Sequence, residues 1–96
     1  MQNRHIYIEK MKQELEVLNM KLNELELSAE NMQEDARKLY NQEVDKVRVQ
    51  SGLAKEKFSQ LVESSENTWN EMVVETEKIR DAFVNSFHYF KSQIWF

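Results

Sequence analysis

The chain has 96 residues, with one glycine, no proline and no cysteine, and its 13 basic and 17 acidic side chains leave a net charge of −4 at pH 7. This length allows at most one small domain, and the lack of cysteine excludes disulfides and thiolate metal sites. Scarce turn residues and 31% charged residues predict an all-α protein. Because no basic cluster is present, nucleic acid is not expected as a partner.

The first half of the chain carries an apolar stripe in steps of three and four residues. Its members are Ile8, Met11, Leu15, Leu18, Leu22, Leu25, Ala29, Met32, Ala36 and Leu39. A repeat that averages 3.5 residues predicts a left-handed coiled coil. Asn3 precedes the stripe and is expected to cap the helix, since its side chain can accept a hydrogen bond from an amide of the first turn.

Beyond Leu39 the stripe shifts, as in a stutter that unwinds a supercoil locally without ending the helix. It continues through Tyr40, Val44, Val47, Ser51, Ala54, Phe58, Leu61 and Ser65. After Ser65 it shifts again and runs through Trp69, Met72, Thr76, Ile79, Phe83, Phe87, Phe90 and Ile94. The second half is therefore amphipathic as well, with bulkier and more aromatic residues.

Two positions are candidates for a turn. Gly52, in residues 51–53, suits the left-handed position that ends many helices, whereas residues 64–67 combine serines and an asparagine with a shift of the stripe. The pattern favours a coiled-coil helical hairpin, and the alternative is one continuous long helix in a coiled-coil oligomer. Residues 1–96 form a single helical domain in either case.

Neither form can bury its stripe alone, because two helices do not enclose a core. The chain is therefore expected to assemble with itself into an oligomeric bundle, as a homodimer or a higher homo-oligomer. The expected oligomer interface is the stripe: Ile8, Met11, Leu15, Leu18, Leu22, Leu25, Met32, Leu39, Phe58, Leu61, Trp69, Met72, Ile79, Phe83, Phe87, Phe90 and Ile94. Tyr89, Trp95 and Phe96 lie off the stripe and are expected to contact a partner protein or a membrane.

Catalytic, cofactor-binding and metal-binding residues are not expected. The glutamates fall on faces away from the stripe, where water solvates them, and no metal-ligand motif accompanies His5 or His88. No segment has the apolar length of a signal peptide or of a membrane span. We therefore expect a cytoplasmic protein that is not an enzyme.

Two stretches, "YIEKMKQELEVLNMKLNELELSAE" and "SENTWNEMVVETEKIRDAF", resemble a widespread family of small bacterial coiled-coil proteins. Most members are uncharacterised, and a few are associated with stress tolerance. The resemblance covers residues 4–84 and implies a bacterial, cytoplasmic protein without catalytic residues. The tail "FHYFKSQIWF" differs from the charged, alanine-rich end that is usual in such relatives.

The function expected from the sequence is that of a structural or protein-interaction module which self-associates. The resemblance adds an association with stress. The alternative is peripheral binding to a membrane interface through the aromatic residues 79–96, whose charges, from Arg80, Asp81 and Lys91, sum to +1.

Overall fold

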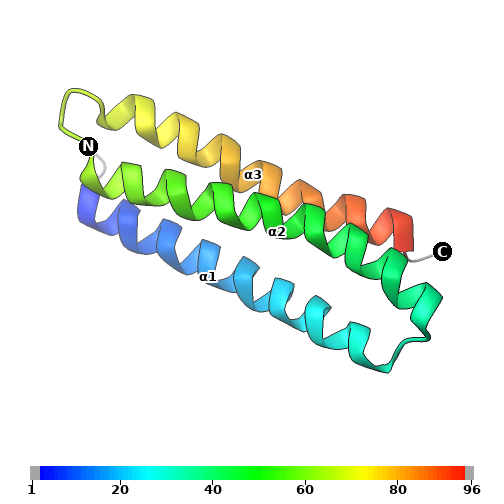
Figure 1. Cartoon of the computed structure of the whole chain (residues 1–96). Helices are drawn as coiled ribbons and strands as arrows, with labels where there is room; N and C mark the ends of the chain where they lie inside the picture. Colours follow the sequence, from blue (N-terminus) through cyan, green and yellow to red (C-terminus); the bar gives the residue numbers. More distant parts are fainter. Residues whose placement is uncertain (1–2, 95–96) are drawn as a thin grey trace.

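The computed structural model, which describes residues 3–94, is a bundle of three helices. Its elements are α1 (Arg4–Ser28), the short 3-10 helix η1 (Ala29–Asn31), α2 (Glu34–Glu63) and α3 (Trp69–Ile94). The helices run up, down and up, so that α1 and α3 are parallel and both pack against α2 (Figure 1). The bundle measures 51 × 20 × 17 Å. The all-α fold class is confirmed.

The chain turns twice, whereas the expected hairpin turns once. The first turn, at residues 29–33, interrupts the first apolar stripe. The amide of Met32 donates to the carbonyl oxygen of Ala29 at 3.2 Å, and the backbone of Met32 and Gln33 is extended, with ψ of 153° at both residues. No glycine or proline lies here, so composition contained no sign of this turn.

Burial explains why the helix ends there. A straight helix would leave its stripe in water, whereas the turn folds α2 back so that the stripes of both helices face each other. Leu15, Leu18 and Leu22 of α1 are buried in one core with Val44 and Val47 of α2. Burying each such side chain contributes about 1.5–3 kcal/mol, which exceeds the roughly 0.5–1.5 kcal/mol of a hydrogen bond lost at the turn.

The second turn, at residues 64–68, falls on one of the two candidate positions. The hydroxyl of Ser64 donates to the carbonyl oxygen of Leu61 at 2.7 Å, and thereby satisfies a group that the end of α2 leaves unpaired. The amide of Thr68 donates to the carbonyl oxygen of Ser65 at 3.2 Å and closes a tight turn. Serine and threonine thus provide the hydrogen bonds that reverse the chain.

Gly52 lies in the middle of α2, and the chain does not turn at residues 51–53. The φ angle of Gly52 is not positive, so the backbone does not need a glycine there. The buried face of α2 continues past this position through Ser51 and Ala54. Gly52 therefore only weakens the helix, by about 0.5–1 kcal/mol relative to alanine.

The predicted cap of α1 and the predicted shift of the stripe in α2 are both confirmed. The side-chain oxygen of Asn3 accepts a hydrogen bond from the amide of His5 at 2.9 Å, which makes Asn3 the cap of α1. The buried residues of α2 are Tyr40, Val44, Val47, Ser51, Ala54 and Leu61. Leu39, which the first stripe included, is instead exposed, because the turn resets the register so that Tyr40 faces the core.

The aromatic residues of α3 complete this core. Phe83 and Phe90 are fully buried. The ring of Phe90 meets Tyr40 of α2 edge to face at 5.2 Å between centroids, and the ring of Phe83 stacks on Phe87 at 5.5 Å. Such aromatic pairs contribute about 0.5–1.5 kcal/mol beyond the area they bury. Much of the aromatic C-terminal stripe is therefore covered within the monomer.

Candidate interaction surface

The first halves of α1 and α3 are joined directly. The ring of Tyr7 lies edge-on to Trp69 at 5.7 Å, and its hydroxyl donates to a carboxylate oxygen of Glu77 at 3.1 Å. Further along both helices, the Arg80 guanidinium pairs with Glu14 at 2.8 Å. These contacts bridge the two helices as far as the Glu14–Arg80 pair and leave only a small hollow of about 70 Å³ between them.

Two buried tyrosines, Tyr7 near the start of α3 and Tyr40 near its end, make the bundle sensitive to alkaline pH. Burial, followed by the hydrogen bond to Glu77, raises the pKa of the Tyr7 hydroxyl well above its usual value. Burial also raises the pKa of Tyr40. Both groups are neutral in the folded protein at pH values where an unfolded chain would begin to ionise them.

We expect the free energy of unfolding to decrease as the pH rises above about 10, the ordinary pKa of tyrosine. The folded chain holds these protons more tightly than the unfolded chain. The resulting stabilisation is complete below that pH and is lost as the pH rises through the folded-state pKa values. Circular dichroism and phenolate absorbance, recorded together, will measure this loss. Tyr7→Phe should make it less steep, and an unchanged pH profile in that variant would contradict the role of Tyr7.

Beyond the Glu14–Arg80 pair, α1 and α3 separate and an apolar groove opens between them. Its floor consists of Leu18 and Leu25 from α1 and Val84 and Phe87 from α3, and its volume is about 310 Å³. A hollow of about 380 Å³ shares Leu18 and Val84 with it and continues toward the ion pair along Val17. Together they form one open channel, which we call the α1/α3 groove.

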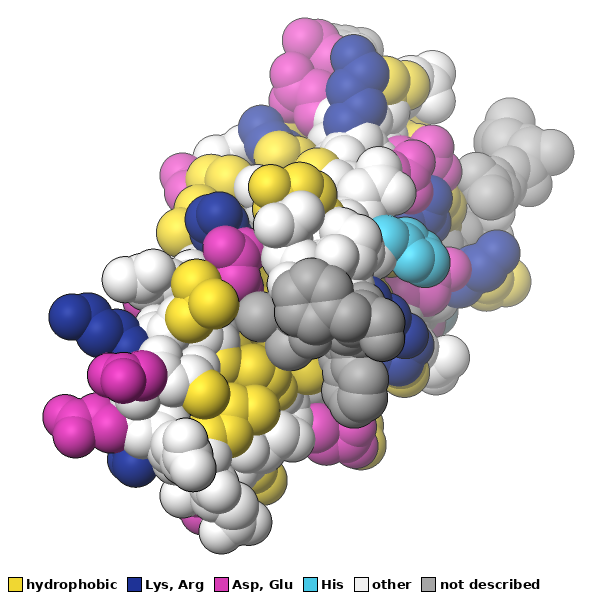
Figure 2. Space-filling model, turned by 90° about the vertical axis from the view of Figure 1, so that its right-hand side faces the viewer, with side chains coloured by type: hydrophobic (Ala, Val, Ile, Leu, Met, Phe, Trp, Pro, Cys, Tyr) yellow, Lys and Arg dark blue, Asp and Glu magenta, His cyan; other side chains and the backbone are white. Residues whose placement is uncertain are grey.

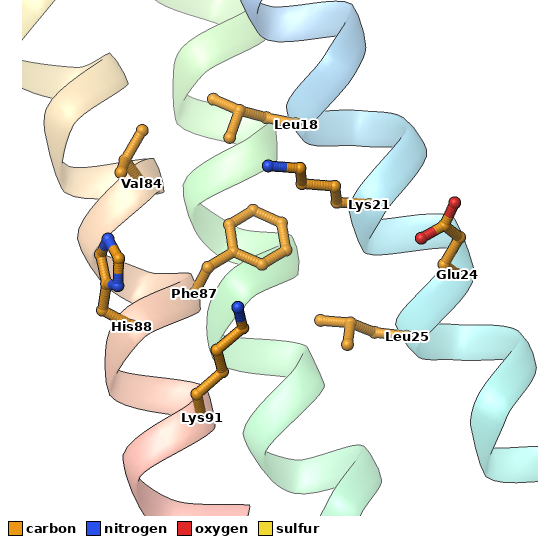
Figure 3. A pocket seen from close by; sticks show the side chains of 8 residues that line it. All are labelled: Leu18, Lys21, Glu24, Leu25, Val84, Phe87, His88 and Lys91. Atoms are coloured by element: carbon orange, nitrogen blue, oxygen red, sulfur yellow. The ribbon is translucent and has the colours of Figure 1, made fainter.

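The rim of the groove is mainly basic. Figure 3 shows Lys21 of α1 and Lys91 of α3 reaching into the space on opposite sides of the Phe87 ring, with His88 at the edge and Glu24 turned away. Neither lysine forms an ion pair with another described residue. This surface is locally positive although the chain carries a net charge of −4.

Helix periodicity brings these residues together. In α1, Leu18 and Leu25 are seven residues apart on the buried stripe, and Lys21 lies between them at its edge. In α3, Val84, Phe87 and Lys91 follow one another at steps of three and four, beside the fully buried Phe83. The two rows face each other across the groove because α1 and α3 run parallel (Figure 1).

The outer face of α1 also carries apolar side chains. Val17, Met20 and Leu27 are 51%, 63% and 63% exposed. They lie on one side of the helix, since their spacings of three and seven residues are close to whole turns. Figure 2 shows that hydrophobic side chains are also exposed among charged ones at the end of the bundle. Contiguous exposed apolar residues mark interaction surfaces more often than isolated ones do.

The structure distributes the expected interface residues among three environments. Those buried inside the monomer are Met11, Leu15, Leu18, Leu22, Leu61, Phe83 and Phe90. Those partly buried are Ile8, Leu25, Met32, Phe58, Trp69, Met72, Ile79 and Phe87. Leu39 is exposed, and the side chain of Ile94 lies outside the described residues. The third helix thus covers most of a stripe that a hairpin would leave for a second copy.

Of the three aromatic residues that lie off the stripe, Tyr89 is within the described residues. Tyr89 is exposed, and the Lys46 ammonium of α2 lies 5.7 Å from its ring centroid. Tyr89 does not line the α1/α3 groove. Trp95 and Phe96 lie outside the described residues.

The sequence pattern found part of the groove and missed its rim. Leu18, Leu25 and Phe87 of the floor belong to the stripe, whereas Lys21, Lys91 and Val84 lie off it, and the positive charge of residues 79–96 pointed only to Lys91. Tyr7 was also missed, because the stripe was placed one residue later, on Ile8. Tyr7 is buried and Ile8 only partly so, because Tyr7 lies one turn before Met11 on the buried face of α1 and its ring packs against Trp69.

The two histidines are far apart. His5 lies in the first turn of α1 and His88 near the end of α3, and parallel helices place these positions at opposite ends of the bundle (Figure 1). Within residues 3–94, no three histidine or carboxylate side chains are grouped so that they could hold a metal ion. Nor is any helix of the described chain both long enough and apolar enough to cross a membrane.

Comparison with known proteins adds no relative. No family model, no curated protein and no solved structure matches this chain. The fold and the groove are therefore the features from which a function can be proposed.

Proposed function

We propose that this protein is a self-associating helical module that acts through protein–protein contact and not by catalysis. The observation that carries this proposal is the α1/α3 groove, whose apolar floor is partly exposed at Leu25, Val84 and Phe87 above the buried Leu18. Amphipathic helices commonly bind in grooves of this kind. A groove that stays open in the monomer is best explained as the binding site of another helix.

The groove has little of what catalysis requires. Acid–base catalysis depends on titratable groups that are desolvated and held near a reacting atom. Lys21, Glu24, His88 and Lys91 instead lie on an exposed rim. The resemblance to small bacterial coiled-coil proteins supports a cytoplasmic, stress-associated role for such a module, and a further partner protein fits the same surface.

Peripheral membrane binding through residues 79–96 is the alternative, and the packing of α3 weighs against it. Phe83 and Phe90 would have to leave the core in order to enter a lipid interface. Each ring that leaves the core loses its packing there and leaves a cavity behind, which destabilises the bundle. The two cations of residues 79–96, Arg80 and Lys91, give only weak attraction to anionic lipid, at about 1 kcal/mol each.

The solution mass tests the proposal. Light scattering over a concentration series should give at least twice the 11.6 kDa of the chain at micromolar concentration. Circular dichroism of the same samples should show that the helices are intact. A folded protein that remains monomeric throughout the series would rule out self-association, and flotation with anionic vesicles would then support the membrane alternative.

A further inference from the structure

We propose that α1 of a second copy fills the α1/α3 groove, and that the contact is reciprocal, so that two chains form a twofold-symmetric dimer. This inference rests on the proposed function and deepens it by naming the partner and the surface. Four helices, α1 and α3 of each copy, would then enclose a common core.

Shape supports α1 as the occupant. Its outer face presents the apolar line Val17, Met20 and Leu27, which the monomer leaves in water. The floor of the groove, between Leu18 on one helix and Val84 on the other, is apolar over the same part of the bundle. The outer line of α1 is exposed in the monomer and the floor of the groove is partly exposed at Leu25, Val84 and Phe87, and both are covered when α1 of one copy lies in the groove of the other.

Charge also supports α1 as the occupant of the groove. On α1, Glu16 lies one turn before Met20 and Glu24 one turn after it, and both carboxylates are exposed. The groove carries Lys21 and Lys91, which have no carboxylate partner among residues 3–94. Two chains of net charge −4 repel each other, so contact is favoured where the basic rim of one meets the acidic flanks of the other.

A twofold axis lets both contacts form at once. Val17 belongs to the outer line of α1 and also lines the groove. The same stretch of α1 is therefore occupant on one side and groove wall on the other. A self-complementary surface of this type closes as a dimer, whereas a head-to-tail contact would continue into a filament.

The test exchanges the charges on the two surfaces. The first variant, Lys21→Glu with Lys91→Glu, makes the groove acidic, and the second, Glu16→Lys with Glu24→Lys, makes the outer line of α1 basic. Each variant alone opposes like charges in both contacts and is expected to raise the dimer dissociation constant at least about tenfold. A mixture in equal amounts pairs the acidic groove of the first variant with the basic helix of the second, and the basic groove of the second, which Glu24→Lys makes more basic, with the native helix of the first. Ultracentrifugation should therefore show that mixing restores the dimer.

The matched control for the first variant is Lys38→Glu with Lys78→Glu, which makes the same change in net charge as that variant, at exposed positions of α2 and α3 away from the groove. It should dimerise like the unchanged protein, and all variants should keep their helical circular dichroism signal. If the unchanged protein is a dimer but the first two variants match the control, this interface is wrong while self-association stands. If the mixture stays monomeric, reciprocal pairing is wrong. If the unchanged protein itself is monomeric, the proposed function fails as well.

Discussion

Replacing Phe83 with alanine is expected to destabilise the bundle by about 3–5 kcal/mol, the usual cost of removing a buried aromatic ring. Phe83 is fully buried on α3 and stacks on Phe87. Its removal leaves a cavity at the centre of a small core, which the surrounding helices can fill only in part. Because domains of this size are stable by only about 5–15 kcal/mol, the loss is a large fraction of the total.

Urea unfolding followed by circular dichroism measures this effect, and Tyr89→Ala is its matched control. Tyr89 lies on the same helix and is also aromatic, but its side chain is 54% exposed. It should lose no more than its contact with Lys46, about 0.5–1 kcal/mol. Equal shifts of the urea midpoint in the two variants would mean that the aromatic face of α3 does not pack inside the monomer.

Gly52→Pro is expected to cost about 3 kcal/mol or more, because proline inside a helix removes a backbone hydrogen bond and its ring clashes with the preceding turn. Gly52 lies near the middle of the 30-residue helix α2, with buried residues on both sides. The variant should lose helical signal and melt at a lower temperature.

The matched control places proline in the second turn. In the turn that the hydrogen bond from Thr68 to Ser65 closes, Glu66 is the second residue, a position that favours proline. Glu66→Pro should therefore leave the melting temperature nearly unchanged. The reverse order of effects, with Gly52→Pro mild and Glu66→Pro severe, would require a different path of the chain.

The sequence was most informative about which residues share a face. Periodicity placed Leu15, Leu18 and Leu22 together on α1, and all three are buried. It also located the shift of the stripe to Tyr40 and a turn at residues 64–67. Helical side chains one turn apart lie on the same side, and this relation holds whatever the helix packs against.

The candidate site was much less accessible from the sequence. Lys21 and Lys91 are seventy residues apart in the chain and look like ordinary solvated lysines. They face one groove only because the chain also turns at residues 29–33, where no glycine or proline lies. This turn divides the chain into three helices, so that α1 is parallel to α3. This arrangement is decided by the packing of helices that are distant in the sequence, and the local residue pattern does not predict such packing.

What the sequence by itself determined is the all-α class and the apolar face of each helix, because both follow from residue type and helical period. The tertiary structure alone decided that the chain folds back twice and that most of the stripe is covered within one chain. It also decided that the surface left open is the groove between α1 and α3. The physical reason is that burial depends on which helices meet, and the free energy gained by covering a third apolar face exceeds the cost of one more turn.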